Sequence, residues 1–268
     1  MRLVRLHPLA EQFASVAGAY EAGRPDYAPA VVGALAAELE LDSHAAVLDL
    51  AAGTGKLTRA LLHAGLDVVA VEPQAPLRDL LADSVGAERV RDGTAEAIPL
   101  ADASVQAVTV ADAFHWFDQP AALAEIRRVT RPGGGLAVLT TVPDWRGTSW
   151  AQAVGEVMRR ARPQHPHFDG PPWQEAVRAA GGWREPREIR VTTSQPTSPD
   201  VILQYLASVS WIAALSGAER TDTLARLAGL VSTGETPAEL PIHVTIGIST
   251  RLPGTSASER RRAGSDRR

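Results

Sequence analysis

The sequence predicts an α/β fold, in which a mostly parallel seven-stranded sheet carries helices on both faces and a small helical cap. Two observations lead to this expectation. Short, almost continuous apolar runs recur along the first half of the chain, which is typical of parallel strands buried on both faces. Later apolar residues alternate with polar ones, which indicates two less buried strands with an antiparallel member at one edge of the sheet.

The expected elements follow one another along the chain. Five buried strands are expected at Ala46 to Leu50, Val68 to Val71, Arg89 to Arg91, Val105 to Val110 and Leu136 to Thr141. The helices between them are expected at Lys56 to His63, Pro76 to Ser84 and Pro120 to Val129. The two alternating strands contain Ile189 with Val191, and Ile242 to Ile248. Strands that alternate with helices predict βαβ units, and hence a parallel sheet.

Helix-start signals place a cap insertion at about residues 195–235, between the two late strands. Ser198 precedes Pro199, an N-cap followed by a first-turn proline, and Ser216 stands three residues before Glu219 as a capping box. This insertion is expected to fold as helices that lie beside the sheet.

The other segments complete the domain plan. Residues 46–252 are expected to form the main domain, and residues 1–45 a helical segment that covers the ligand site. A further helix is expected to open with the capping pair Ser149 and Gln152. Residues 253–268, with five arginines against two acidic residues, are expected to be a disordered basic tail.

Composition excludes several classes of function. The 268 residues include no cysteine, which excludes disulfides, thiol nucleophiles and cysteine-based zinc sites. A net charge of -4 makes the chain a poor general binder of nucleic acid. No apolar run approaches the roughly 18 residues that a membrane span needs. The expectation is a cytoplasmic monomer or homodimer, with no nucleic-acid or membrane partner.

A loop of small residues follows the first expected strand. Ala51 to Gly55 leads from this strand into a helix, so the backbone turns where a ligand can approach it closely. A P-loop is excluded, because Lys56 is followed by Leu57 rather than Ser or Thr. A dinucleotide fingerprint stays an alternative, although Thr58 stands where its third Gly or Ala is expected.

An acidic residue before this loop favours another nucleotide. The run Asp49-Leu50-Ala51-Ala52-Gly53-Thr54-Gly55 resembles the first motif of class I S-adenosylmethionine-dependent methyltransferases, with Ala51 in place of the usual first glycine. Glu72 ends the next strand, where an acid can accept hydrogen bonds from both ribose hydroxyls. Asp92 to Glu96 resemble the adenine-contacting segment of that family. The resemblance implies a Rossmann-like fold and S-adenosylmethionine as cosubstrate.

Further segments resemble the type 11 branch of these methyltransferases, which includes trans-aconitate methyltransferase. They are Tyr20 to Tyr27, Ala113 to Asp118 and Arg131 to Gly135, with later tryptophans at Trp173 and Trp211. The residues that the resemblance implies for the cofactor are Tyr20, Arg24, Asp49, Ala51, Gly53, Gly55, Glu72, Pro73, Thr94, Ala95 and Ala111. For Arg24 the partner is either the methionine carboxylate or an acidic substrate.

The acceptor pocket is expected to have aromatic walls. Aromatic residues are absent between Tyr27 and Phe114 and gather on both sides of that stretch. The pocket residues expected from this distribution are Trp116, Trp173 and Trp211. His115, just past the fourth strand, is the candidate catalytic base, with a purely structural role as the alternative.

The expected reaction is methyl transfer to a small molecule. Transfer from a sulfonium is an in-line displacement that needs alignment and a dry site but no metal. The Asn/Asp-Pro-Pro-aromatic run of the methyltransferases that act on amino nitrogens of DNA and protein is missing, because Ala113 follows Asp112. An oxygen of a small molecule, in a carboxylate or hydroxyl, is therefore the expected acceptor, with nitrogen or carbon of a small molecule as the alternatives. An NAD-type oxidoreductase and a non-catalytic binding protein with a nucleotide fold are the alternatives.

Overall fold

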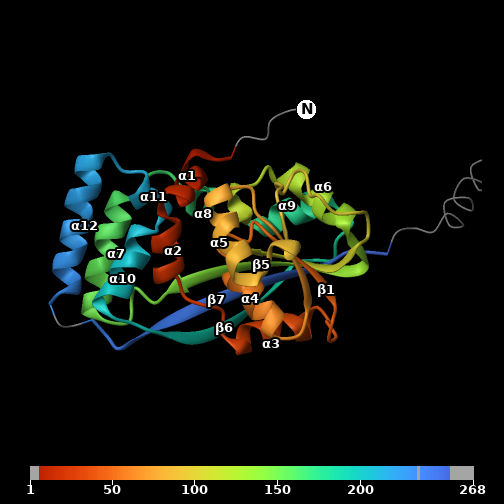
Figure 1. Ribbon diagram of the computed structural model, residues 1–268, viewed down its shortest axis with the longest axis horizontal. Coiled ribbons are helices and arrows are strands. Elements are labelled where there is room, and N and C mark those ends of the chain that lie inside the picture. Colours follow the sequence, from red (N-terminus) through yellow and green to blue (C-terminus); the bar gives the residue numbers. More distant parts are fainter. Residues whose placement is uncertain (1–5, 234–235, 254–268) are drawn as a thin grey trace, which may run out of the picture.

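The computed structural model describes residues 6–233 and 236–253, and the predicted tail beyond residue 253 lies outside them. Seven strands form one sheet in the order β3-β2-β1-β4-β5-β7-β6 (Figure 1). They are β1 (Ala46–Leu50), β2 (Asp67–Val71), β3 (Val90–Arg91), β4 (Val105–Ala111), β5 (Thr130–Pro143), β6 (Arg187–Pro196) and β7 (Glu239–Thr250). The first five strands are parallel, and β7 is antiparallel to both β5 and β6. The predicted fold class is confirmed.

Strand β5 is longer than the sequence predicts. Thr130 already pairs with Val105 of β4, and the register between the two strands then shifts. The run Arg131 to Gly135, expected to precede the strand, therefore belongs to it. The reason is that β5 lies between β4 and β7, so both of its edges have partners over a long stretch.

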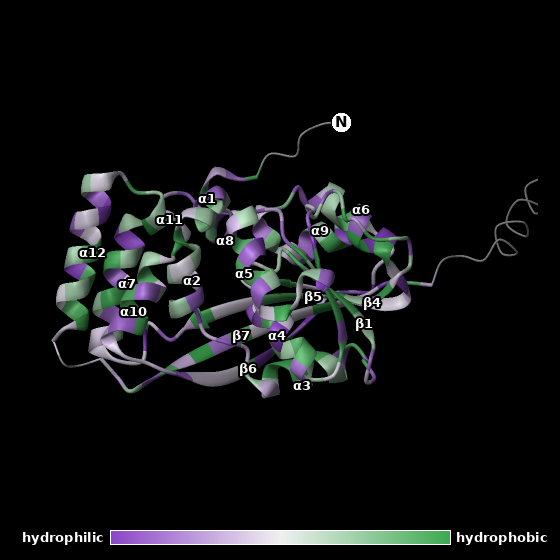
Figure 2. Cartoon of the chain, viewed as in Figure 1, coloured by the Kyte–Doolittle hydropathy of each residue, from purple (hydrophilic) through white to green (hydrophobic). Residues whose placement is uncertain are grey.

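Helices cover both faces of the sheet. α3 (Pro29–Glu38) and α4 (Lys56–His63) pack on one face, and α6 (Gln119–Val129) and α9 (Trp173–Ala180) pack on the other. Successive side chains of a strand point to opposite faces, so Val47 of β1 joins the first core and Leu48 the second. Figure 2 shows the hydrophobic residues concentrated in these strands. α5 (Ala75–Val85) follows β2.

A cap of helices lies at one end of the sheet (Figure 1). It comprises α7 (Ser149–Ala161), α10 (Pro199–Ala207), α11 (Ser210–Ala213) and α12 (Gly217–Val231). These helices share a hydrophobic core of their own, around side chains such as Trp150 and Leu206. The last three come from residues 195–235, where the sequence places the cap, whereas α7 joins it from outside that segment.

Side-chain caps fix the starts of these helices. The predicted caps at Ser198 and Ser216 are both present. The N-cap of α7, however, is Thr148, whose hydroxyl accepts a hydrogen bond from Ala151 N at 3.1 Å. Ser149 was expected in that role, and the prediction is wrong by one residue because Thr148 is the last extended residue before the helix.

The N-terminal segment lies between the cap and the sheet (Figure 1). It contains α1 (Pro8–Glu11), η1 (Gln12–Val16) and α2 (Ala17–Gly23). α2 packs so closely on α10 that a Cβ added at Gly23 would lie only 2.0 Å from Tyr205 N. The remaining short elements are η2 (Ala87–Arg89), η3 (Phe114–Trp116) and α8 (Pro166–Asp169). Within the described residues, no helix has the length and apolar character of a membrane span.

Candidate active site

The loop between β1 and α4 is fixed from beneath by Asp49. This side chain is buried, and its carboxylate accepts hydrogen bonds from Thr58 Oγ1 at 2.6 Å and Thr109 Oγ1 at 3.1 Å. Burial raises the pKa of Asp49 to about 6, although the two hydroxyls favour the charged form. Asp49 therefore orders the loop from inside the protein and does not line a cavity.

The loop itself has three residues with positive φ. They are Ala51 at 57°, Gly53 at 60° and Gly55 at 91°. Gly55 was expected to contact the cofactor, but it faces α5, where a Cβ would lie 2.6 Å from Leu81 Cδ1. Ala51 occupies the left-handed region that glycine favours, so the replacement of the motif's first glycine places strain in the loop.

We expect Ala51→Gly to stabilise the protein by up to about 1 kcal/mol. An alanine in the left-handed region costs about 1 to 2 kcal/mol, and glycine removes this cost. Glycine also gives the unfolded chain more conformational freedom, which offsets about 0.5 to 1 kcal/mol of the gain. Denaturant unfolding measures the difference. Ala52→Gly is the matched control, because φ is not positive there, and it is expected to destabilise. If the Ala51→Gly protein were less stable than the Ala52→Gly protein, the positive φ of Ala51 would not be a source of strain.

A cavity of about 130 Å³ lies above this loop, and we call it the loop cavity. The carboxyl ends of β1, β2 and β4 meet there, which is where open parallel sheets bind ligands. Eight predicted cofactor residues line it, namely Tyr20, Ala51, Gly53, Glu72, Pro73, Thr94, Ala95 and Ala111. The other three, Arg24, Asp49 and Gly55, do not.

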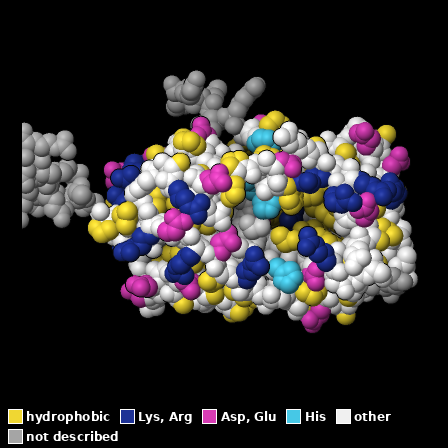
Figure 3. All heavy atoms as spheres, turned by 180° about the vertical axis from the view of Figure 1, so that it is seen from behind, with side chains coloured by type: hydrophobic (Ala, Val, Ile, Leu, Met, Phe, Trp, Pro, Cys, Tyr) yellow, Lys and Arg dark blue, Asp and Glu magenta, His cyan; other side chains and the backbone are white. Residues whose placement is uncertain are grey.

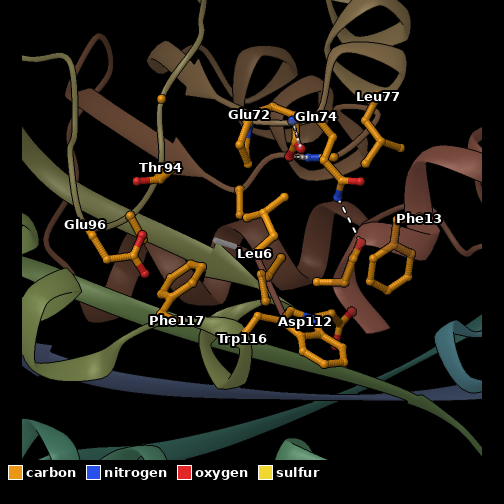
Figure 4. A pocket seen from close by; sticks show the side chains of 18 of the residues that line it. Leu6, Phe13, Glu72, Gln74, Leu77, Thr94, Glu96, Asp112, Trp116 and Phe117 are labelled. Atoms are coloured by element: carbon orange, nitrogen blue, oxygen red, sulfur yellow. Dashed lines mark hydrogen bonds between the residues drawn. The ribbon is translucent and has the colours of Figure 1, made fainter. Parts of the chain in front are cut away.

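The N-terminal segment also contributes to the loop cavity. Figure 4 shows the side chain of Leu6 near its middle, with Phe13 at its edge. Both residues belong to the segment 1–45, whose role as a cover for a bound cofactor stays a prediction. Sequence reasoning missed both, because neither lies in a recognisable motif.

Glu72 joins the end of β2 to the glycine loop. Its side chain is buried, with Oε2 accepting a hydrogen bond from Gly53 N at 2.9 Å and Oε1 one from Gln74 N at 2.9 Å. Burial raises the pKa of Glu72 to about 7, because the loss of water outweighs these two bonds. A carboxylate has about four acceptor positions, so Glu72 can also accept hydroxyl donors from a ligand.

Two buried polar atoms at the loop cavity lack partners among the described residues. They are Thr94 Oγ1 and Trp116 Nε1. Buried polar groups in folded proteins are nearly always hydrogen-bonded, so such groups at a cavity indicate a polar ligand. The loop cavity thus contains carboxylates that can accept hydrogen bonds from hydroxyl groups, two polar atoms without partners among the described residues, and a stretch of backbone at Gly53 that no side chain covers. These features suit a nucleoside.

A second cavity of about 580 Å³ adjoins the first, and we call it the aromatic cavity. Four residues line both, namely Phe13, Tyr20, Asp112 and Trp116. The other aromatic residues in its wall are Trp145, Phe168, Tyr205 and Trp211. Trp173, expected in this wall, instead lines a third cavity of about 340 Å³, which adjoins the aromatic cavity at Asp112, His115, Thr140 and His167. Its ring packs edge-on against Phe114, with ring centroids 6.4 Å apart.

Two of the three predicted tryptophans, Trp173 and Trp211, should therefore respond differently to truncation. Trp211→Ala opens the aromatic cavity and should raise the acceptor's KM about tenfold, because one wall contact is lost. Trp173→Ala removes a ring in close contact with Gly247 and should lower the unfolding free energy by about 3 kcal/mol. Acceptor kinetics and denaturant unfolding on both variants measure this. Equal effects of the two substitutions on KM would contradict the placement of Trp173 outside the acceptor site.

Asp112 was not predicted as a site residue, and it lines all three cavities. Its φ of 52° is unusual for a residue other than glycine and turns the chain at the end of β4. Asp112 Oδ1 accepts from Thr141 N at 2.8 Å, and Oδ2 lies 3.5 Å from the donating Tyr27 hydroxyl. Burial raises the pKa of Asp112 above its ordinary value.

Three histidines lie close together at the aromatic cavity. The ring of His115 is 5.5 Å from that of His165 and 5.0 Å from that of His167, between centroids. Burial lowers the pKa of His115 to about 2, with the neighbouring histidines adding to the shift. Within the parts of the chain that are described, no group of three or more His, Asp or Glu side chains is placed to hold a metal ion.

Arg24 faces the aromatic cavity rather than the loop cavity. Its Nε donates to Ser208 Oγ at 3.0 Å, and its guanidinium lies over the rings of Tyr20 and Tyr205 at 5.2 and 4.6 Å from their centroids. Ser208 and Tyr205 belong to the cap region. Sequence reasoning could not find these partners, because the packing of α2 on α10 creates the contact.

Comparison with known proteins shows which family this chain resembles. A family model described as a methyltransferase domain, of the type 11 branch, matches residues 48–138. An uncharacterized methyltransferase of Mycobacterium tuberculosis is 38% identical over 222 residues, which cover 82% of this chain and 86% of that protein. A malonyl-[acyl-carrier protein] O-methyltransferase of Pectobacterium atrosepticum is 38% identical over 95 residues, 35% of this chain and 38% of that protein.

A solved structure with a similar fold also belongs to a protein designated a methyltransferase. A protein of Anaeromyxobacter dehalogenans designated a type II methyltransferase is 27% identical, with a TM-score of 0.55, and covers 86% of this chain and 99% of its own. The NAD-type oxidoreductase and the non-catalytic binding protein are therefore set aside. The chain belongs to the class I S-adenosylmethionine-dependent methyltransferases and is an enzyme of that family.

Proposed function

We propose that this enzyme binds S-adenosylmethionine in the loop cavity and methylates an oxygen of a small molecule held in the aromatic cavity. One observation carries the proposal. The two cavities meet at Phe13, Tyr20, Asp112 and Trp116, so a donor in one and an acceptor in the other would lie side by side. Alignment of two reactants in this way supplies a large part of enzymatic rate enhancement.

Residues of the loop cavity fit the donor. Glu72 would accept the ribose hydroxyls, Thr94 would bind the base end, and Gly53 leaves the backbone open. S-adenosylmethionine, when bound, supplies the electrophilic methyl group. Tyr20 and Trp116 offer aromatic faces at the junction of the cavities, where a cation such as a sulfonium is attracted to a ring face.

Asp112 is the group best placed to handle a proton from the acceptor. It lies at the junction, and only its Oδ1 has a short hydrogen bond, to Thr141 N. Oδ2 accepts only the long hydrogen bond, at 3.5 Å, from the Tyr27 hydroxyl, so it can also accept one from the hydroxyl of an acceptor, whose proton it would take as the oxygen attacks the methyl group. His115 is a weaker candidate, because a base with a pKa of about 2 binds a proton poorly.

The names of related proteins support oxygen as the acceptor atom. The Pectobacterium relative is named as an O-methyltransferase, although the match covers 35% of this chain. The aromatic walls and volume of the second cavity suit a small organic molecule rather than a polymer.

Isothermal titration of the full chain tests the donor. We expect binding of S-adenosylmethionine and of S-adenosylhomocysteine, and none of NAD. Incubation with methyl-labelled S-adenosylmethionine and a panel of matched hydroxy, carboxy and amino compounds then tests the acceptor, with label expected on oxygen. Failure of both sulfur compounds to bind would overturn the proposal, and label only on amines would overturn its oxygen part.

A further inference from the structure

The aromatic cavity carries an excess of positive charge. Its arginines are Arg24, Arg146, Arg159 and Arg162, and its carboxylates are Asp112 and Asp144. Burial lowers the pKa of His115 to about 2 and that of His165 to about 4, so these two histidines add no charge near neutral pH. Figure 3 shows basic and histidine side chains around a hollow on this face of the molecule. A concave site with one sign of charge concentrates ligands of the other sign.

Three of these arginines already have partners or lie in water. Arg24 donates to Ser208, and its guanidinium lies over the rings of Tyr20 and Tyr205. Arg159 is exposed and pairs with Glu156, and Arg146 is exposed on the rim. None of these three therefore needs a ligand to complete its hydrogen bonds.

Arg162 differs from them. It follows α7, with 24% of its side chain exposed, and its guanidinium lies 4.3 Å from the centroid of the Phe168 ring. Its Nη1 is buried and forms an ion pair with Asp169 Oδ2 at 3.5 Å, but it has no hydrogen-bond partner among the described residues. That carboxylate oxygen already accepts from His165 N at 2.7 Å. A planar guanidinium with open donors at a cavity is suited to a carboxylate, which it can bind with two parallel hydrogen bonds.

The walls near Arg162 are flat rings. Trp211 lies 6.0 Å from Phe168 and 5.2 Å from His165, between centroids, and its Nε1 is anchored on Met158 O at 3.2 Å. A ring anchored as that of Trp211 is favours a flat apolar ligand, because such a ligand gains contact area without displacing the ring.

Asp112 determines which end of the ligand lies where. A carboxylate beside Asp112 would be repelled by it, whereas a hydroxyl there can donate to Oδ2. The charged group of the ligand is therefore directed to Arg162, and its hydroxyl to the junction with the loop cavity.

We infer that the acceptor is a flat, apolar hydroxy acid, and that Arg162 binds its carboxylate while the hydroxyl receives the methyl group. The inference rests on the proposed function of the aromatic cavity as the acceptor site. It goes further by assigning the substrate class and a residue that selects it.

Calorimetry with two probes of the same shape tests this. The full chain, saturated with S-adenosylhomocysteine, is titrated with 4-hydroxycinnamate and with its neutral amide. We expect the acid to bind about 10- to 100-fold more tightly, the range of a charge-assisted pair. Arg162→Gln should reduce this preference to near unity with the amide unaffected, and Arg162→Lys should keep part of it.

Arg160→Gln is the matched control. Arg160 lies two residues away, is exposed, and pairs with Glu156 instead of lining the cavity, so its loss should leave both probes unchanged. Equal affinity for acid and amide, a preference that survives in Arg162→Gln, or no binding of either probe would overturn the inference. Loss of S-adenosylhomocysteine binding would instead show that the proposed function fails, so the two failures are distinguishable.

Discussion

Replacing Gly53 by valine is expected to lower the affinity for S-adenosylmethionine at least about 100-fold, or about 2.7 kcal/mol. Gly53 lines the loop cavity, and no atom lies within 4 Å of a Cβ built there, so the new side chain would enter the space that the donor is proposed to occupy. The φ of 60° also disfavours a β-branched residue, which should lower stability by about 1 to 2 kcal/mol. Titration calorimetry and denaturant unfolding measure the two effects separately.

Gly65→Val is the control for backbone strain. Gly65 has a φ of 84° and equally open surroundings, but it lies in the turn before β2, at the opposite end of that strand from the loop cavity. It should lose similar stability and keep its affinity for the donor. If both variants lost affinity equally, strain rather than the cavity would explain the result, and the assignment of the loop would fall.

The fold and the loop cavity could be predicted because they depend on local patterns. Continuous apolar runs mark the buried strands, and β1 and α4 lie where those patterns place them. Glu72 and Gly53 stand at the ends of such elements, so their meeting follows from the parallel sheet, and the hydrogen bond between them at 2.9 Å is a direct consequence. Gly55 shows the limit of this reasoning, because a motif cannot distinguish contact with a ligand from contact with Leu81.

The aromatic cavity could be predicted only in outline. The uneven distribution of aromatic residues indicated which segments form its wall, and Trp116 and Trp211 lie there. Trp173 lies outside that wall, because the chain passes from the aromatic cavity to the 340 Å³ cavity just before this residue. The composition of the sequence contains no information about that change of position. His165 and Arg162 were missed for the same reason, since their places depend on how the cap packs. Asp112 had a usable signal in its position directly after the fourth strand.

The second large effect is expected for Asp112→Asn with a hydroxyl acceptor. Loss of a general base costs about 100- to 10,000-fold in turnover, so kcat should fall by at least 100-fold. Asparagine has the same shape and tolerates the left-handed φ of 52°, so the fold should be kept. The affinity for S-adenosylmethionine should change little, which calorimetry checks. His115→Ala should reduce kcat far less.

The dependence of kcat on pH separates the two candidates for the base. Burial has the largest effect on the pKa of Asp112 and raises it, against the hydrogen bonds from the backbone and side chain of Thr141 and the charges of Arg24 and His167. Because only the deprotonated carboxylate accepts a proton, wild-type kcat should rise with pH through that raised pKa and then level off. His115, with a pKa of about 2, is deprotonated over the whole working range and would produce no such rise. Glu72 titrates near pH 7 and can affect donor binding, so the profile is measured at saturating S-adenosylmethionine. An Asp112→Asn enzyme that kept the wild-type profile and turnover would show that Asp112 is not the base.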